Sequence, residues 1–363
     1  MATYENPRLV LDSSRPIAPG RVAWRSPSNI AIVKYWGKRA VQLPRNPSVS
    51  LTLSAAYTDM AIEYALKERP EPAISLEFFF EEKPHEAFRQ KVLAFLEAVT
   101  PIFPFLRQLH LTLRSSNSFP HSTGIASSAS SMSALALCLC SLEHRFFHTL
   151  PDDAAFDRKA SYVARLGSGS ACRSVYPYAA LWGLTAALPS SSDECAVPLE
   201  AQLHPVFKTL CDDILVVSSA QKAVSSRAGH ALMEGNPFAE TRYDQARINT
   251  VRLLEVLRSG DVEAFGQLAE GEALSLHALM LCSRPPYLLL HPNTVAILHR
   301  VQAFRQESRL PVYFTLDAGP NVHLLYPAEC ADTLRPWVEA ELRPLCENGY
   351  YLADRVGEGP EER

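Results

Sequence analysis

The stretch Ser118-Phe-Pro-His-Ser-Thr-Gly-Ile-Ala-Ser-Ser128 leads directly into an apolar run at residues 129–147. Leucine, alanine, cysteine and methionine occupy nearly every side of that run, which predicts a helix buried in the core. A loop rich in glycine and serine at such a helix N-terminus presents free backbone N–H groups and the positive end of the helix dipole. The stretch therefore predicts a phosphate-binding loop. A serine that merely caps the helix is the alternative, and the GxxxxGK[ST] pattern of P-loop proteins is absent.

The segments before residue 189 alternate between strand and helix patterns. Short alternations of apolar and polar residues, punctuated by proline and asparagine, predict strands of a half-buried sheet. Apolar residues at helical spacing predict helices. The expected strands lie within 9–65 and at 110–114, and the expected helices at 86–99 and 157–166.

A stretch rich in proline, serine and aspartate at 189–198 predicts the linker between two domains, 1–195 and 196–363. The polar residues 357–363 are expected to fray. The elements expected after the linker are a strand from Asp213, helices within 240–280 and at 293–307, and a pair of strands at 312–317 and 321–326.

The composition excludes several classes of protein. At about 150 residues per domain, 363 residues suggest two domains, and 47% hydrophobic with 20% charged residues is typical of a globular chain. A net charge of -4 provides no general attraction for nucleic acid or acidic membranes, so neither is an expected partner. We found no signal sequence and no apolar run of 18 residues, and we expect a cytoplasmic protein. The eight cysteines form no CxxC pair and the eleven histidines no HExxH motif, so no structural metal is expected.

Two further segments combine small residues with cations. In Gly167-Ser-Gly-Ser-Ala-Cys-Arg-Ser174, the guanidinium of Arg173 can bind a carboxylate or phosphate through two hydrogen bonds, although a solvated surface arginine is the alternative. In Ser26-Pro-Ser-Asn-Ile-Ala-Ile-Val-Lys-Tyr-Trp-Gly-Lys-Arg39, a strand delivers lysines, an arginine, a tyrosine and a tryptophan into one turn. This density of donors suits a polyanion, but exposed cations after a strand are also common.

Two segments of the second half complete the set. Asp317-Ala-Gly-Pro-Asn321 lies between two predicted strands, where Asp317 could either form an Asx-turn or serve as a catalytic carboxylate. Lys222-Ala-Val-Ser-Ser-Arg-Ala-Gly-His230 adds cations and hydroxyls. Each of the five segments has a structural explanation, but all five together favour one anion-binding site.

The order of these motifs resembles the diphosphomevalonate decarboxylases, members of the GHMP kinase superfamily, over residues 22–326. The resemblance implies an α+β, GHMP kinase fold of two domains with the active site in the cleft between them, and a homodimer. It also implies an ATP- and magnesium-dependent reaction. Mevalonate 5-diphosphate would be phosphorylated on its C3 hydroxyl and would then lose phosphate and carbon dioxide to give isopentenyl diphosphate.

The resemblance also assigns roles to individual residues. A carboxylate must orient the tertiary alcohol and accept its proton, and Asp317 matches that position. Magnesium would arrive with ATP, next to Ser128, without ligands assigned among the protein side chains. The catalytic set is Asp317, Ser128, Arg173 and Lys38. The substrate-binding set is Asn29, Lys34, Tyr35, Lys38, Ser168, Ser170, Arg173, Ser226 and His230. The ATP-binding set is Ser118, Pro120, Gly124, Ile125, Ala126, Ser127 and Ser128.

The sequence departs from the family pattern at three places. Gly229-His230 replaces Gly-Met, Pro120-His-Ser-Thr-Gly124 replaces Pro-Thr-Ala-Ala-Gly, and Ser26-Pro27 replaces Ala-Pro. An imidazole near phosphates is expected to become protonated below neutral pH and to tighten substrate binding. The alternatives are a relative acting on mevalonate 5-phosphate, a 3-kinase without decarboxylation, and a catalytically silent metabolite-binding protein.

Overall fold

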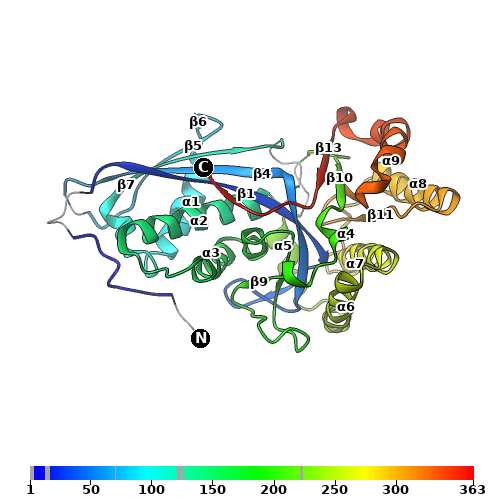
Figure 1. Ribbon diagram of the computed structural model, residues 1–363, viewed down its shortest axis with the longest axis horizontal. Helices are drawn as coiled ribbons and strands as arrows, with labels where there is room; N and C mark the ends of the chain where they lie inside the picture. The colour runs from blue at the N-terminus through cyan, green and yellow to red at the C-terminus, as the bar shows by residue number, and fades with distance from the viewer. Residues whose placement is uncertain (1–3, 13–16, 70, 121–124, 126, 221–223) are drawn as a thin grey trace.

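The computed structural model describes residues 4–12, 17–69, 71–120, 125, 127–220 and 224–363. Two units lie side by side, each built on its own sheet (Figure 1). This architecture confirms the expected α+β class. No helix among these residues is long and apolar enough to cross a lipid bilayer.

The first sheet is built around two long antiparallel strands, β1 (Gly20–Val33) and β4 (Ser48–Leu66). Its strand order is β14-β1-β4-β7-β5-β6, and β8 and β9 extend it beside the first half of β4. Strands β5 and β7 are parallel, and the other pairs are antiparallel. The bounds are β5 (Ser75–Phe80), β6 (Lys83–Pro84), β7 (Leu109–Asn117), β8 (Ala179–Trp182), β9 (Ala196–Pro198) and β14 (Glu361–Glu362), with a separate pair β2 (Lys38–Arg39) and β3 (Leu43–Pro44).

Three helices cover one face of this sheet: α1 (Glu86–Ala98), α2 (Ser127–Phe147) and α3 (Asp153–Gly167). Helix α2 is buried along most of its length and packs on β1 and β4, as its apolar sequence predicts. Side chains of His85 and Asp152 cap α1 and α3. The predicted helices at 86–99, 129–147 and 157–166 are therefore confirmed.

The second sheet has the order β11-β12-β10-β13, with all neighbours antiparallel. Its strands are β10 (Cys211–Leu215), β11 (Tyr313–Thr315), β12 (Val322–Tyr326) and β13 (Tyr351–Arg355). Its helices are α4 (Pro205–Lys208), α5 (Ser226–Ala231), α6 (Ala239–Ser259), α7 (Val262–Leu281), α8 (Pro292–Ser308) and α9 (Ala331–Trp337). The predicted pair of strands around residue 317 is confirmed as β11 and β12.

An apolar cluster joins the two units. It combines Ile30 and Phe119 of the first unit with Leu254, Phe265 and Leu325 of the second. Because apolar burial is the main stabilising term in folding, this shared core holds the residues on either side of the junction in a defined arrangement.

The expected fraying of residues 357–363 is wrong. Strand β14 pairs with Trp24 and Arg25 of β1, and the N–H of Arg363 donates to the carbonyl of Ala23 at 2.9 Å. The free edge of β1 supplies backbone hydrogen-bond partners, so even a polar segment is held. In Figure 1 this segment runs from β13 back across the first unit.

Candidate active site

Lys34 and Asp317 form an ion pair between the two units. Lys34 follows the last residue of β1, its side chain is only 1% exposed, and its Nζ lies 3.0 Å from Asp317 Oδ1. Asp317 lies in the turn between β11 and β12, 283 residues further along the chain. The turn is closed by the backbone, with Gly319 N–H donating to the Asp317 carbonyl at 2.7 Å. An Asx-turn would not by itself require Asp317 to pair with a buried cation.

Residues of α6 and α7 hold this pair in place. Fully buried Glu272 accepts a hydrogen bond from Lys34 N–H at 2.9 Å and forms an ion pair with Arg242. Asn249 donates to the other oxygen of Glu272 at 2.6 Å. His277, one turn and a half further along α7, donates from Nε2 to the Asp317 carbonyl at 3.1 Å. A buried carboxylate held by a cation and two donors is rigid, which fixes the backbone at Lys34.

Sequence reasoning missed these supporting residues. The pattern over 240–280 predicts only helices, although Glu272 and His277 are polar residues on a largely apolar helix. Polar side chains within an apolar stripe are the signal that could have identified them, because burial requires that they have partners.

Arg173 is buried, not solvated, which excludes the surface interpretation. It is 2% exposed, its Nε donates to Ser50 Oγ at 3.0 Å, and its Nη2 donates to Asn29 Oδ1 at 3.3 Å. Asn29 is itself held by Ser174 Oγ at 2.7 Å. Buried Nη1 has no hydrogen-bond partner among the described residues. Burial lowers the pKa of Arg173, while nearby Asp317 opposes that shift. A buried guanidinium with an unused N–H is suited to bind an anion.

The turn after β1 places Tyr35 against His230. Their ring centroids lie 4.5 Å apart, and the ring centroid of Trp36 also lies 4.5 Å from that of the imidazole. The hydroxyl of Tyr35 is buried without a hydrogen-bond partner in the described part of the chain. Burial raises the pKa of Tyr35, so this phenol remains a neutral donor.

The expected protonation of His230 is wrong. Its Nδ1 accepts a hydrogen bond from Gly37 N–H at 3.0 Å, which requires a lone pair on that nitrogen. Burial, followed by the charge of Lys38, lowers the pKa of His230 to about 3. The imidazole is therefore neutral at physiological pH, with its proton on Nε2. Its packing against two aromatic rings removes the water that would stabilise the cation.

Two of the predicted segments meet at the start of α2. The exposed Ser128 lies in the first turn of the helix, and its Oγ is 3.3 Å from Ser168 Oγ. Ser127 is the first residue of α2, and the Ile125 carbonyl accepts a hydrogen bond from Ser28 Oγ at 3.1 Å. Ser118 is anchored to β4, and Pro120 lies exposed beyond it. Gly124, Ala126 and Lys222 lie outside the described residues.

The remaining predicted residues border the same region. The Ser170 carbonyl accepts from Asn29 Nδ2 at 3.2 Å, and Lys38 Nζ donates to Gln42 Oε1 at 3.4 Å. Burial, and then the charge of Arg227, lowers the pKa of Lys38. Ser226 is exposed in the first turn of α5, four residues before His230. The described parts of all five segments thus contribute contacts around one junction.

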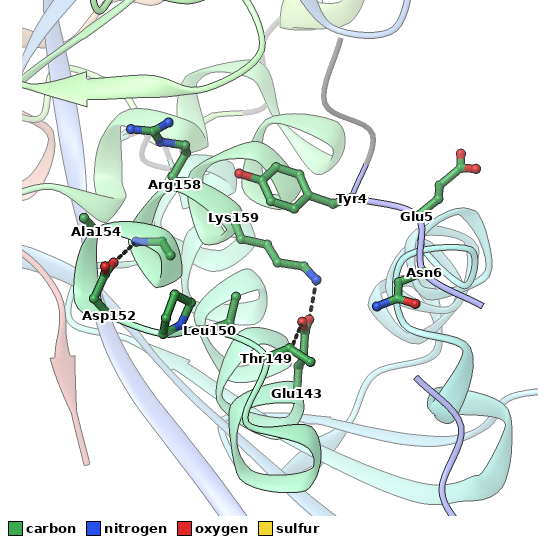
Figure 2. Close-up of a pocket in the computed structure, with 12 residues that line it drawn as sticks. Tyr4, Glu5, Asn6, Glu143, Thr149, Leu150, Asp152, Ala154, Arg158 and Lys159 are labelled. Carbon is green, nitrogen blue, oxygen red and sulfur yellow. Dashed lines mark hydrogen bonds and ion pairs between the residues drawn. The ribbon is translucent and has the colours of Figure 1, made fainter. Parts of the chain in front are cut away.

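A separate pocket of about 630 Å³ lies at the ends of α2 and α3 (Figure 2). The ion pair between Lys159 and Glu143 lies within it, and Asp152 caps α3 at its rim. None of the predicted site residues that the structure describes lines this pocket.

Comparisons with known proteins identify the relatives of this chain. Residues 26–194 match the "Diphosphomevalonate decarboxylase-like N-terminal domain" and residues 213–353 the "Mevalonate 5-diphosphate decarboxylase C-terminal domain". The chain is 31% identical to the diphosphomevalonate decarboxylase of Candida albicans over 83% of both chains. It is also 31% identical to that of Saccharomyces cerevisiae, over 84% of this chain and 77% of the relative.

Solved structures show the same relationship. Mevalonate diphosphate decarboxylase from Staphylococcus aureus superposes with a TM-score of 0.80 at 27% identity, over 95% of this chain and 98% of the other. A structure described as being in complex with MVAPP, AMPPCP and magnesium has a TM-score of 0.78 at 26% identity, over 95% and 99%. These matches confirm the expected GHMP kinase fold. From the two family matches, the fungal relatives and the shared fold, the chain belongs to the diphosphomevalonate decarboxylase family.

Proposed function

We propose that the protein catalyses the ATP-dependent decarboxylation of mevalonate 5-diphosphate to isopentenyl diphosphate, with release of ADP, phosphate and carbon dioxide, in the mevalonate pathway of isoprenoid biosynthesis. The observation that carries this proposal is the ion pair between buried Lys34 and half-buried Asp317, beside Arg173, whose Nη1 has no partner among the described residues. A cation-held carboxylate and a free guanidinium N–H are what a hydroxy-carboxylate substrate needs. The family and the solved complex with MVAPP, AMPPCP and magnesium support it.

Asp317 accepts the proton of the C3 hydroxyl as that oxygen attacks the terminal phosphorus of ATP. A tertiary alcohol is a weak nucleophile, so a carboxylate within hydrogen-bond reach must orient it. The ion pair with Lys34 directs the carboxylate, and the hydrogen bond from His277 holds its backbone.

Arg173 holds the substrate carboxylate by its free Nη1. In the second step the C3–O bond breaks with phosphate as the leaving group, and the electrons of the C1–C2 bond form the new double bond as carbon dioxide departs. Strong charge stabilisation of a carboxylate that leaves as neutral carbon dioxide would favour the ground state, so positioning is the useful contribution. The hydrogen bonds to Ser50 and Asn29 fix the guanidinium plane for this task.

The remaining residues bind the phosphates. We assign the substrate diphosphate to Tyr35, Lys38, Ser168, Ser170 and His230, with Asn29 and Ser226 at the border, and the ATP phosphates to the loop from Ser118 to Ser128. Neutral His230 contributes an Nε2–H donor rather than a charge.

Magnesium fits the site as an ion that arrives with ATP. The described residues contain no cluster of three His, Cys, Asp or Glu side chains placed to hold a metal. Magnesium commonly binds through substrate phosphates and few protein oxygens, and Ser128 Oγ, 3.3 Å from Ser168 Oγ, is the protein oxygen we assign to it. When bound, the ion neutralises charge on the phosphates.

One assay tests the proposed function. The purified protein is mixed with ATP and magnesium and, separately, with mevalonate, its 5-phosphate or its 5-diphosphate, and both ADP and carbon dioxide are measured. We expect equal amounts of both products, with the 5-diphosphate preferred. ADP without carbon dioxide would indicate a kinase, and neither product from any substrate would indicate a silent binding protein.

Three further assignments belong to the proposal. We place the domain division close to residues 195–196, because the first family match ends at 194 and the second begins at 213. Strand β9 still pairs with the first sheet. We also propose a homodimer, on the family resemblance, and a cytoplasmic location. Light scattering of the purified protein and fractionation of cells that produce it test these two assignments.

A further inference from the structure

Asp354 connects the second domain to a bulge in β4 of the first. Its carboxylate, on a residue only 5% exposed near the end of β13, accepts hydrogen bonds from three consecutive N–H groups of β4. The donors are Ser54 at 3.0 Å, Ala55 at 2.6 Å and Ala56 at 2.8 Å. Its own strand adds a fourth hydrogen bond, from Arg355 N–H at 2.7 Å. Such a set of donors stabilises the ionised carboxylate against the burial that raises the pKa of Asp354.

The bulge cannot satisfy these N–H groups from within its own sheet. In the register between β1 and β4, Pro27 is opposite Tyr57 and Asn29 is opposite Thr52. Residues 53–56 of β4 therefore stand opposite the single residue Ser28. Ala56 is buried and Ala55 is half-buried, while Ser54 is exposed. Because a backbone N–H shielded from water requires an acceptor, the shape of the bulge depends on Asp354.

The same bulge anchors the start of the phosphate loop. Ser118 Oγ donates to the Ala55 carbonyl at 2.6 Å and accepts from Tyr57 N–H at 2.9 Å. The N–H of Ser118 donates to the Tyr57 carbonyl at 3.1 Å. Ser28, the residue opposite the bulge, donates from Oγ to the carbonyl of Ile125 near the other end of the loop at 3.1 Å. Both ends of the loop are thus tied to the two strands at this bulge.

We propose that Asp354 is a positioning residue for ATP: by holding the bulge at residues 53–56, it sets the positions of Ser118 and Ile125. The inference rests on the proposed function, since it takes this loop to bind the ATP phosphates. Residues that are already held in place before ATP binds cost less ordering on binding, and this preorganisation increases affinity. Asp354 touches no reacting atom, so its effect is on ATP binding and not on the chemistry of the other substrate.

Asp354→Asn tests this inference. The amide keeps the size of the side chain, but it removes the charge and presents an NH₂ group to backbone N–H donors. Affinity for AMPPCP with magnesium is measured by titration calorimetry with mevalonate 5-diphosphate saturating. We expect it to fall by about tenfold, the effect of losing one charge-assisted hydrogen bond, while the KM for mevalonate 5-diphosphate changes by less than about twofold.

Asp213→Asn is the matched control. Asp213 is a buried carboxylate of the same sheet, on β10, and accepts from Tyr326 Oη at 2.7 Å. We expect this variant to lose thermal stability without a selective loss of AMPPCP affinity. Equal weakening of AMPPCP binding by both substitutions would mean general destabilisation and would overturn the inference.

A double-mutant cycle with Ser118→Ala tests whether Asp354 affects AMPPCP binding through Ser118 or independently of it. If Asp354 acts through Ser118, the two substitutions together weaken AMPPCP binding by less than the product of their separate factors. Unchanged AMPPCP affinity in Asp354→Asn, or simple multiplication in the cycle, overturns the inference. If Asp354→Asn does not fold, Ser118→Ala alone must weaken AMPPCP binding selectively, and normal binding overturns the inference. Failure of the wild-type protein to bind AMPPCP would instead reject the proposed function.

Discussion

Replacing Asp317 by asparagine should separate the stability of the site from its chemistry. The substitution removes the carboxylate that faces Lys34 Nζ at 3.0 Å. The Lys34 ammonium is only 1% exposed. Apart from the new amide, its acceptor among the described residues is then the Ala31 carbonyl. The variant therefore contains a buried cation without its counter-charge.

The cost in stability follows from the exposure of the two partners. Removing one member of a fully buried pair costs about 3–5 kcal/mol. Asp317 is 35% exposed, and water can replace part of its interaction, so we expect a loss of about 1–2 kcal/mol in the free energy of unfolding. The loss of a general base should lower turnover by at least about a hundredfold.

The assay measures ADP and carbon dioxide in parallel, together with urea unfolding of each variant. Because phosphorylation precedes decarboxylation, the two products should fall together. The double variant Lys34→Met/Asp317→Asn removes the unpaired cation and should recover stability without recovering turnover. Turnover within tenfold of wild type, corrected for folded protein, would refute the role of Asp317 as base. Retained ADP release with lost carbon dioxide would move Asp317 to the elimination step.

Three other substitutions test the site. Arg173→Lys keeps the charge but loses the planar guanidinium that Ser50 and Asn29 hold. The kcat should fall by at least about tenfold, with little change in the Kd of AMPPCP. An equal loss of AMPPCP binding would contradict the assignment of Arg173 to the substrate carboxylate. Ser128→Ala should lower turnover by about tenfold. Because the side chain is exposed, the free energy of unfolding should change by less than about 1 kcal/mol. Normal activity per folded molecule would mean that Ser128 has only a structural role. His230 has a pKa of about 3 in the folded protein against 6.5 unfolded, so the folded state binds fewer protons between these values and its stability falls as pH drops below 6.5. Between pH 6.5 and 5 this amounts to about 2 kcal/mol in urea unfolding, which His230→Met should remove; an identical pH dependence in the variant would show that the imidazole titrates normally.

The sequence predicted those features that depend on neighbouring residues. The apolar run at 129–147 became α2 because burial on every side leaves a helix few alternatives, and the alternation around residue 317 became the paired strands β11 and β12. The motif segments identified the family because their residue types and spacing are visible in one sequence. The fold class and the family could therefore be predicted before any contact was known, and the predicted site residues stay a prediction.

Contacts between distant residues could not be predicted in this way. Nothing near Lys34 in the sequence identifies Asp317 as its partner, and nothing near Glu272 shows that it supports the Lys34 backbone. The burial of Arg173 and the neutrality of His230 also arise only when several elements pack around them, because desolvation is a property of the whole surroundings.

The chain after β13 gives the clearest contrast. Its polar composition predicts fraying, yet Asp354 holds the bulge of β4 and β14 pairs with β1. A free sheet edge and a set of unsatisfied N–H groups exist only once the first domain has folded. By itself the sequence determined the main elements and the family, since these follow from local pattern. The tertiary structure alone decided which charges pair, which stay neutral and how Ser118 and Ile125 are held, because those depend on groups brought together across the chain.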